Sequence, residues 1–220
     1  MILYHGSSVA VRKPLYGYGK KTNDYGQGFY CTEDAELAKE WACLDERGGI
    51  LNTYAFRTEG LVFLDLNQKT IVEWLAVLLH NRSVRYANPV ERRTAEYLIS
   101  HYLPDTAPYD VITGYRADDS YFSYARAFLS NTISLRQLGD AMRLGNLGTQ
   151  VFLQSEKAFA QLSFIESASV EGEIYYPRRY DRDDQAKKDY HKLLESGVTE
   201  GIFANDILRK EMKLHDLCIS

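Results

Sequence analysis

Two aromatic side chains, Tyr30 and Trp41, stand at positions from which both could contact one flat ring. Residues 29–32 (Phe-Tyr-Cys-Thr) are aromatic or β-branched and predict a short strand, and Trp41 follows on a predicted helix. Gly26 and Gly28 predict a loop before the strand, where the backbone can turn tightly or approach a ligand closely. This order of loop, strand and helix would bring both rings to one end of the unit, as a clamp for a planar ring. Packing of the two rings in the core is the alternative interpretation.

The chain begins with an apolar strand that ends in His5, Gly6 and Ser7. An imidazole can hydrogen-bond a hydroxyl group, and a glycine can offer its backbone N–H and C=O to a ligand at close range. Ser7 could contact a ribose or a phosphate, and a plain turn residue is the alternative. These three residues are therefore candidates for the same binding site as the two rings.

Residues 3–7 (Leu-Tyr-His-Gly-Ser) and 26–32 (Gly-Gln-Gly-Phe-Tyr-Cys-Thr) resemble the first two NAD-binding motifs of the ADP-ribosyltransferase superfamily. The resemblance is to its His-Tyr branch, which includes diphtheria toxin and PARP-like enzymes. Tyr30 and Trp41 keep the spacing of eleven residues between the motif tyrosine and a second aromatic. The resemblance covers roughly residues 1–66 and 109–166, and the chain looks closest to an uncharacterised family of short stand-alone bacterial proteins.

This resemblance implies that NAD is a substrate. Transfer of ADP-ribose breaks the bond between nicotinamide and a ribose carbon and leaves positive charge on the sugar, so the site must hold the nicotinamide and stabilise that charge. His5 would bond a ribose hydroxyl, Gly6 would bind the nicotinamide amide through its backbone, and Tyr30 and Trp41 would enclose the ring. The implied NAD-binding residues are His5, Gly6, Ser7, Gly28, Tyr30 and Trp41.

Gln150 occupies the position of the third family motif, at the start of a predicted strand. Members of the superfamily usually carry an acid there. A glutamine can accept a hydrogen bond from a ribose hydroxyl but brings no charge to the developing cation. The implied catalytic residues are His5, Tyr30 and Gln150. Asp118 and Asp119 precede a predicted helix and either cap it or position a substrate or an antitoxin.

The elements that would position these residues alternate between short strands and helices. Strands are predicted at residues 1–4, 29–32, 50–56, 61–66, 109–115, 150–154 and 164–165. Helices are predicted near residues 35–42 (capped by Thr32 or Asp34), 71–79, 89–99, 121–129, 135–144 (with a capping box at Ser134), 155–162 (capped by Ser155), 184–194 and 202–214.

The fold class predicted with this resemblance is α+β: a split, mainly antiparallel β-sandwich with flanking helices. The prediction is a single domain over residues 1–220, with a helical insertion at 67–105 and a helical extension at 168–220. Between the two helices of the insertion, residues 82–86 (Arg-Ser-Val-Arg-Tyr) are interpreted as a solvated loop, with nucleic-acid contact as the less favoured alternative.

Composition excludes several function classes. Hydrophobic residues make up 45% and charged residues 25% of the chain, as in ordinary globular proteins. The net charge of −4 gives no overall basic field for nucleic acid or an anionic membrane. The three cysteines, Cys31, Cys43 and Cys218, do not have the spacing of a disulfide framework or a zinc site. With no predicted membrane span or signal peptide, a cytoplasmic protein is expected.

The function predicted from the resemblance is mono-ADP-ribosyl transfer, a glycosyl transfer from NAD, by a bacterial toxin or effector. The target would be a macromolecule, a protein rather than a nucleic acid, and an antitoxin or immunity protein is a possible partner. Two alternatives stay open. One is a catalytically weak NAD-binding or sensing module, because of Gln150, and the other is a non-enzymatic interaction protein with the same fold.

Overall fold

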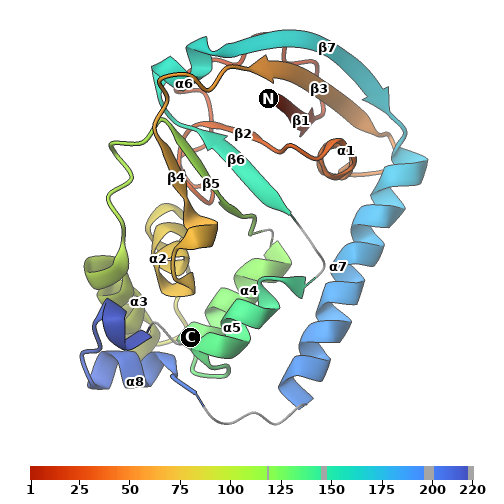
Figure 1. The fold of residues 1–220 in the computed structure, drawn as a ribbon. Coiled ribbons are helices and arrows are strands. Elements are labelled where there is room, and N and C mark those ends of the chain that lie inside the picture. The colour runs from red at the N-terminus through yellow and green to blue at the C-terminus, as the bar shows by residue number, and fades with distance from the viewer. Residues whose placement is uncertain (118, 145–147, 196–200, 218–220) are drawn as a thin grey trace.

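The protein has an α+β fold in which two β-sheets lie together at one end and most helices at the other (Figure 1). The computed structural model describes residues 1–117, 119–144, 148–195 and 201–217. In this part of the chain no helix is long and apolar enough to cross a membrane.

One sheet has three strands in the order β1-β3-β7, all antiparallel, and the other has four in the order β2-β6-β5-β4. In the second sheet only the β4–β5 pair is parallel. The strands are β1 (Ile2–Ser7), β2 (Phe29–Cys31), β3 (Gly49–Phe56), β4 (Phe63–Asp65), β5 (Val111–Tyr115), β6 (Thr149–Leu153) and β7 (Leu162–Val170).

The two sheets pack face to face and are also joined through their backbones. Leu3, Phe29, Tyr54 and Val151, from strands of both sheets, belong to one buried apolar cluster. Tyr4 exchanges two backbone hydrogen bonds with Thr32, of 2.8 and 2.9 Å. This bridge brings β1 next to β2, and therefore His5 of β1 next to Tyr30 of β2.

The helices are α1 (Ala35–Ala42), α2 (Ile71–Asn81), α3 (Pro89–Tyr102), α4 (Asp119–Leu129), α5 (Leu135–Ala141), α6 (Glu156–Ala160), α7 (Gly172–Glu195) and α8 (Ala204–Arg209), with 3₁₀ turns η1 (Leu66–Gln68) and η3 (Leu214–Leu217). The predicted caps at Ser134 and Ser155 are confirmed by their side-chain hydrogen bonds. Of the two alternatives at α1, Asp34 is the cap, because its carboxylate accepts from two backbone N–H groups of the first turn.

The predicted helical insertion at 67–105 consists of η1, α2 and α3. α2 is buried on nearly all sides rather than along one stripe, since it lies between α3, α5 and the core, and Trp74 at its centre is completely buried. The insertion therefore forms much of the main hydrophobic core.

The predictions for the segment after residue 160 are partly wrong. Leu162, expected on the helix, is the first residue of β7, which is nine residues long rather than two. β7 pairs with β3 along its length, and this pairing stabilises a strand whose residues after Ile165 are mostly polar and exposed. The predicted extension at 168–220 therefore begins with the end of this strand.

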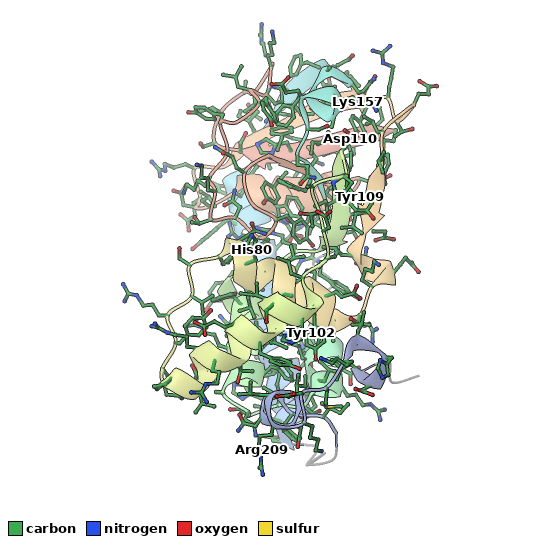
Figure 2. The ribbon with its side chains drawn as sticks, turned by 90° about the vertical axis from the view of Figure 1, so that its left-hand side faces the viewer. His80, Tyr102, Tyr109, Asp110, Lys157 and Arg209 are labelled. Atoms are coloured by element: carbon green, nitrogen blue, oxygen red, sulfur yellow. The ribbon has the colours of Figure 1, made fainter. Side chains whose placement is uncertain are left out.

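The C-terminal helices also differ from the prediction. α7 begins at Gly172, twelve residues before the predicted start, although Pro177 lies within it. The helix predicted at 202–214 is interrupted after Arg209, and Glu211 has a positive φ of 48°. Tertiary contacts fix this break, because the hydroxyl of Tyr97 on α3 donates to the carbonyl of Met212. Figure 2 shows Tyr102 of α3 and Arg209 at the helical end, and Asp110 and Lys157 at the sheet end.

Candidate functional site

A cleft of about 610 Å³ lies where β1, β2, β6, α1 and α7 meet. Five residues predicted for the site line this cleft, although they come from segments far apart in the chain: His5, Gly6, Tyr30, Trp41 and Gln150. Ser7 and Gly28, also predicted for the site, are not among the lining residues of the described part of the chain.

His5 is held by its contact with the neighbouring sheet. Its Nδ1 lies 2.7 Å from the carbonyl oxygen of Tyr30, and its ring lies against Phe29 at 4.5 Å between centroids. A carbonyl oxygen only accepts, so Nδ1 is the protonated nitrogen and Nε2 is the acceptor of the neutral ring. Burial lowers the pKa of the imidazole, which the hydrogen bond to Tyr30 opposes in part. His5 is therefore suited to accept a hydrogen bond from a ligand hydroxyl.

Tyr30 presents a fixed ring. Its hydroxyl donates to the carbonyl of Gly26 at 2.8 Å and accepts from the backbone N–H of Tyr25 at 3.0 Å. The ring lies against Phe152, with centroids 4.7 Å apart. Burial raises the pKa of the phenol well above its ordinary value, so the hydroxyl stays protonated. Tyr30 thus offers the cleft a rigid aromatic surface rather than a proton donor.

Trp41, at the C-terminal end of α1, carries the guanidinium of Arg116 over its ring at 4.4 Å from the ring centroid. Such a contact between a planar cation and an indole face is worth about 0.5–2 kcal/mol. The indole Nε1 is buried, and it has no hydrogen-bond partner in the described part of the chain. One face of the predicted clamp is therefore in contact with a flat cation of the protein itself.

Gln150 belongs to a buried polar cluster at the base of the cleft. Its Nε2 donates to the carboxylate of Asp24 at 3.3 Å and to the carbonyl of Tyr115 at 3.0 Å. The other carboxylate oxygen of Asp24 accepts from Nε of Arg82 at 2.7 Å, and a second guanidinium nitrogen of Arg82 donates to the carbonyl of Ala117. Gln150 and Asp24 are 3% and 5% exposed. Gln150 is therefore buried rather than facing the solvent.

The glycines at the site have packing roles. A Cβ on Gly6 would lie 2.0 Å from the carbonyl oxygen of Ala38, so only glycine lets β1 approach α1 this closely. A Cβ on Gly28 would lie 2.3 Å from the carbonyl oxygen of Leu153, and the absence of a side chain there lets the loop pack on β6. Gly6 lines the cleft as well as packing on α1, whereas Gly28 contacts β6.

Ser7 takes part in a separate polar contact. Its hydroxyl donates to the carbonyl of Val9 at 2.7 Å and accepts from the side chain of Asn52 at 3.0 Å. This supports the turn interpretation of Ser7. Of the two acids predicted either to cap a helix or to position a substrate or an antitoxin, Asp118 lies outside the described residues, and Asp119 is the first residue of α4.

Several lining residues were missed by the sequence analysis. Asp24 had no predicted role, and Arg82 was placed in a solvated loop, yet they form an ion pair in the cleft. Their separation of 58 residues leaves no local pattern that could reveal the pair. α7 forms a further wall with Tyr176, Arg179, Tyr180 and Asp183, which recur at helical spacing and therefore share one face.

α7 is held by contacts at two places along its length. Arg182 forms a two-pronged ion pair with Glu40 of α1, with N–O distances of 2.6 and 2.8 Å. Farther along the helix, Tyr190 lies against Tyr124 of α4, with ring centroids 4.2 Å apart. The helix therefore connects the sheet end to the helical end, as Figure 1 shows.

The fold and the cleft define an α+β protein with a site of aromatic, imidazole, carboxamide and guanidinium groups. Residues 1–164 match the family described as "Protein of unknown function (DUF3990)", and the chain belongs to this family. No curated protein and no solved structure matches the chain. α7 lies beyond the matched residues, so the family region and the segment after it both contribute to the cleft.

Proposed function

We propose that the protein is a mono-ADP-ribosyltransferase that uses NAD to modify a macromolecular target. The observation that carries this proposal is that His5, Tyr30, Trp41 and Gln150 line one cleft. These residues reach it from β1, β2, α1 and β6, and their chemistry matches the needs of a nicotinamide ribose: flat rings for the base and acceptors for the hydroxyls.

In the proposed reaction the bond between the nicotinamide nitrogen and ribose C1′ breaks. Its electron pair leaves with neutral nicotinamide, and a lone pair of the target forms the new bond to C1′ as the target loses its proton. Tyr30 and Trp41 would hold the nicotinamide, and stacking contributes about 1 kcal/mol for each ring beyond area burial. Nε2 of His5 would accept from a ribose hydroxyl, which orients the sugar for bond cleavage.

The charges of the cleft support a substrate with phosphate groups. Arg82, Arg116 and Arg179 line it together with Asp24 and Asp183. Asp24 accepts from Arg82, which places that ion pair at the base. Arg116, over Trp41, and Arg179, on α7, are the guanidinium groups proposed to meet the pyrophosphate of NAD.

A protein is the proposed target rather than a nucleic acid, because the net charge of −4 does not favour an approach to polyanions. In this role the protein would act as a toxin or effector, with an antitoxin or immunity protein as its partner. The second candidate function is NAD binding or sensing with little transfer, which the uncharged Gln150 favours.

Calorimetric titration of the full chain with NAD tests the binding step. Incubation with labelled NAD and a cell lysate, followed by separation of the labelled macromolecules, tests transfer. Binding with labelling supports the transferase, and binding without labelling supports the sensor. Absence of NAD binding by the folded protein would contradict both candidates.

A further inference from the structure

The carboxylate of Asp24 lies next to the side chain of Gln150 and was assigned no role by the sequence. One of its oxygens accepts from Nε2 of Gln150 and from the backbone N–H of Ala117 at 3.0 Å, and the other accepts from Arg82. Asp24 is therefore held by three donors at the base of the cleft. A charged group with so many partners has one orientation, because any rotation would leave buried donors without an acceptor.

The partners of Gln150 determine which way its carboxamide points. Two partners of its side-chain nitrogen, the Asp24 carboxylate and the Tyr115 carbonyl, can only accept hydrogen bonds. The flipped carboxamide would bring Oε1 to about the same positions, against two acceptor oxygens. That arrangement replaces two hydrogen bonds by two repulsive contacts at a buried site. Oε1 is therefore the atom that Gln150 can present to a ligand.

We propose that Asp24 is a positioning residue that orients Gln150 so that its Oε1 accepts a hydrogen bond from a hydroxyl of the bound ligand. The same contacts make a carboxamide necessary at position 150: an ionised acid there would place a carboxylate against Asp24 and the Tyr115 carbonyl. The orientation of the carboxamide follows from contacts within the protein and does not depend on a bound ligand. The ligand hydroxyl, a ribose hydroxyl of NAD, rests on the proposed function.

The first experiment needs no ligand. Gln150→Glu introduces a second carboxyl beside Asp24, and mutual repulsion should raise the pKa of the new group in the folded protein. A folded-state pKa above the unfolded value, about 4.3 for Glu, means that stability is lost as the pH rises through and above that value. The midpoint temperature of thermal unfolding of Q150E, relative to that of wild type, should therefore decrease as the pH is raised from 4.5 to 8.

Two variants isolate the role of Asp24 in this effect. Gln150→Met, which is similar in length and uncharged, should show no such pH dependence relative to wild type. The double variant D24A/Q150E should lose most of it, because the opposing carboxylate is gone. Tyr25, which contacts Gln150, is the same in Q150E and D24A/Q150E. So are the titratable or charged groups that line the cleft with Gln150, among them His5, Tyr30, Arg82, Arg116, Arg179 and Asp183. Equal pH dependence of the unfolding midpoint in Q150E and D24A/Q150E would overturn the proposal. If D24A/Q150E does not fold, equal pH dependence in Q150E and Q150M would overturn it instead.

The second experiment measures transfer, or NAD affinity if transfer is weak. Asp24→Ala and Gln150→Ala should each lower it about tenfold, and the double variant should be no worse than either, because Asp24 acts through Gln150. Losses that multiply to about a hundredfold would contradict this. Glu73→Ala is the matched control: Glu73 is 7% exposed and bonded to Thr70 outside the cleft, so its loss should lower stability but not NAD affinity. If wild type binds no NAD, the proposed function fails while the pH experiment still decides the role of Asp24.

Discussion

Nδ1 of His5 lies 2.7 Å from the carbonyl oxygen of Tyr30, and this hydrogen bond crosses from one sheet to the other. Because the donor nitrogen is used in this contact, the ring can only turn its acceptor nitrogen toward a ligand. The imidazole and the aromatic ring of the site are thus fixed relative to each other by one bond between β1 and β2.

His5→Ala should abolish labelling with NAD while the protein stays folded. The variant loses one hydrogen bond and the contact with Phe29, a cost of about 1 kcal/mol, which corresponds to a shift of roughly 2–4 °C in the midpoint of thermal unfolding. Transfer assays and calorimetric unfolding of the same samples test this. A variant that labels normally would remove His5 from the site.

The pH dependence of NAD binding should follow the lowered pKa of His5. The imidazole of His5 is harder to protonate in the folded protein than in the unfolded chain. The free energy of unfolding should therefore decrease as the pH falls below the ordinary histidine pKa of about 6.5, because the unfolded chain then takes up the proton more readily. NAD affinity should stay constant between pH 8 and 6.5 and weaken at lower pH, where Nε2 becomes protonated. His5→Gln, which does not titrate, should remove this decline, and an unchanged decline would assign it to another group.

Trp41→Phe and Trp41→Ala should separate the contribution of Trp41 to NAD binding from its contribution to the stability of the fold. Trp41→Ala is expected to weaken NAD binding roughly tenfold, because one face of the proposed clamp is lost. The chain has one other tryptophan, Trp74, which is completely buried, so the fluorescence change on adding NAD should come from Trp41 and vanish in Trp41→Phe. Unchanged affinity in a folded Trp41→Ala variant would assign the ring to packing.

Arg116→Ala should strengthen the binding of free nicotinamide several-fold. The guanidinium of Arg116 lies over Trp41 at 4.4 Å, so a ring that stacks there must displace it. Removing a contact of about 0.5–2 kcal/mol lowers the free energy that the displacement costs. Nicotinamide has no phosphate, and fluorescence titration with it therefore isolates this competition from any contact between Arg116 and the pyrophosphate. Weaker nicotinamide binding in the variant would contradict competition for the ring face.

Gly6→Ala should destabilise the protein whether or not NAD is present. Its Cβ would lie 2.0 Å from the Ala38 carbonyl and 2.6 Å from the Ala42 nitrogen, so β1 and α1 would have to move apart. Overpacking of this kind costs typically 1–3 kcal/mol, measurable by urea unfolding. Gly139→Ala on α5 is the control, since nothing lies within 4 Å of its Cβ and alanine favours a helix by about 0.5–1 kcal/mol. Equal stability of the two variants would show that β1 and α1 separate easily.

Local patterns were sufficient for the elements that carry the site. The capping residues Asp34, Ser134 and Ser155 act through bonds within a few residues of themselves, so their chemistry is visible in the sequence. The strands around His5 and Tyr30 are likewise short apolar runs between turn residues. Five of the residues that line the cleft were instead predicted from the resemblance of short motifs to those of a known superfamily.

What could not be predicted depends on long-range contacts. Asp24 and Arg82 become a pair only because the loop before β2 meets the end of α2. The part of β7 after Ile165 is mostly polar and is stabilised by its pairing with β3. α7 contains a proline, which usually ends a helix. The position of α7 across the cleft depends on Glu40 and Tyr124, which belong to distant helices.

The lack of space around Gly6 also limits what evolutionary comparison can reveal. A position that must be glycine for β1 to pack on α1 will be glycine in related chains whether or not they bind NAD. Invariance there measures the geometry of the fold and carries no information about activity. At Gln150 the pairing with Asp24 imposes a second structural requirement, so that position is informative only when it is compared together with position 24.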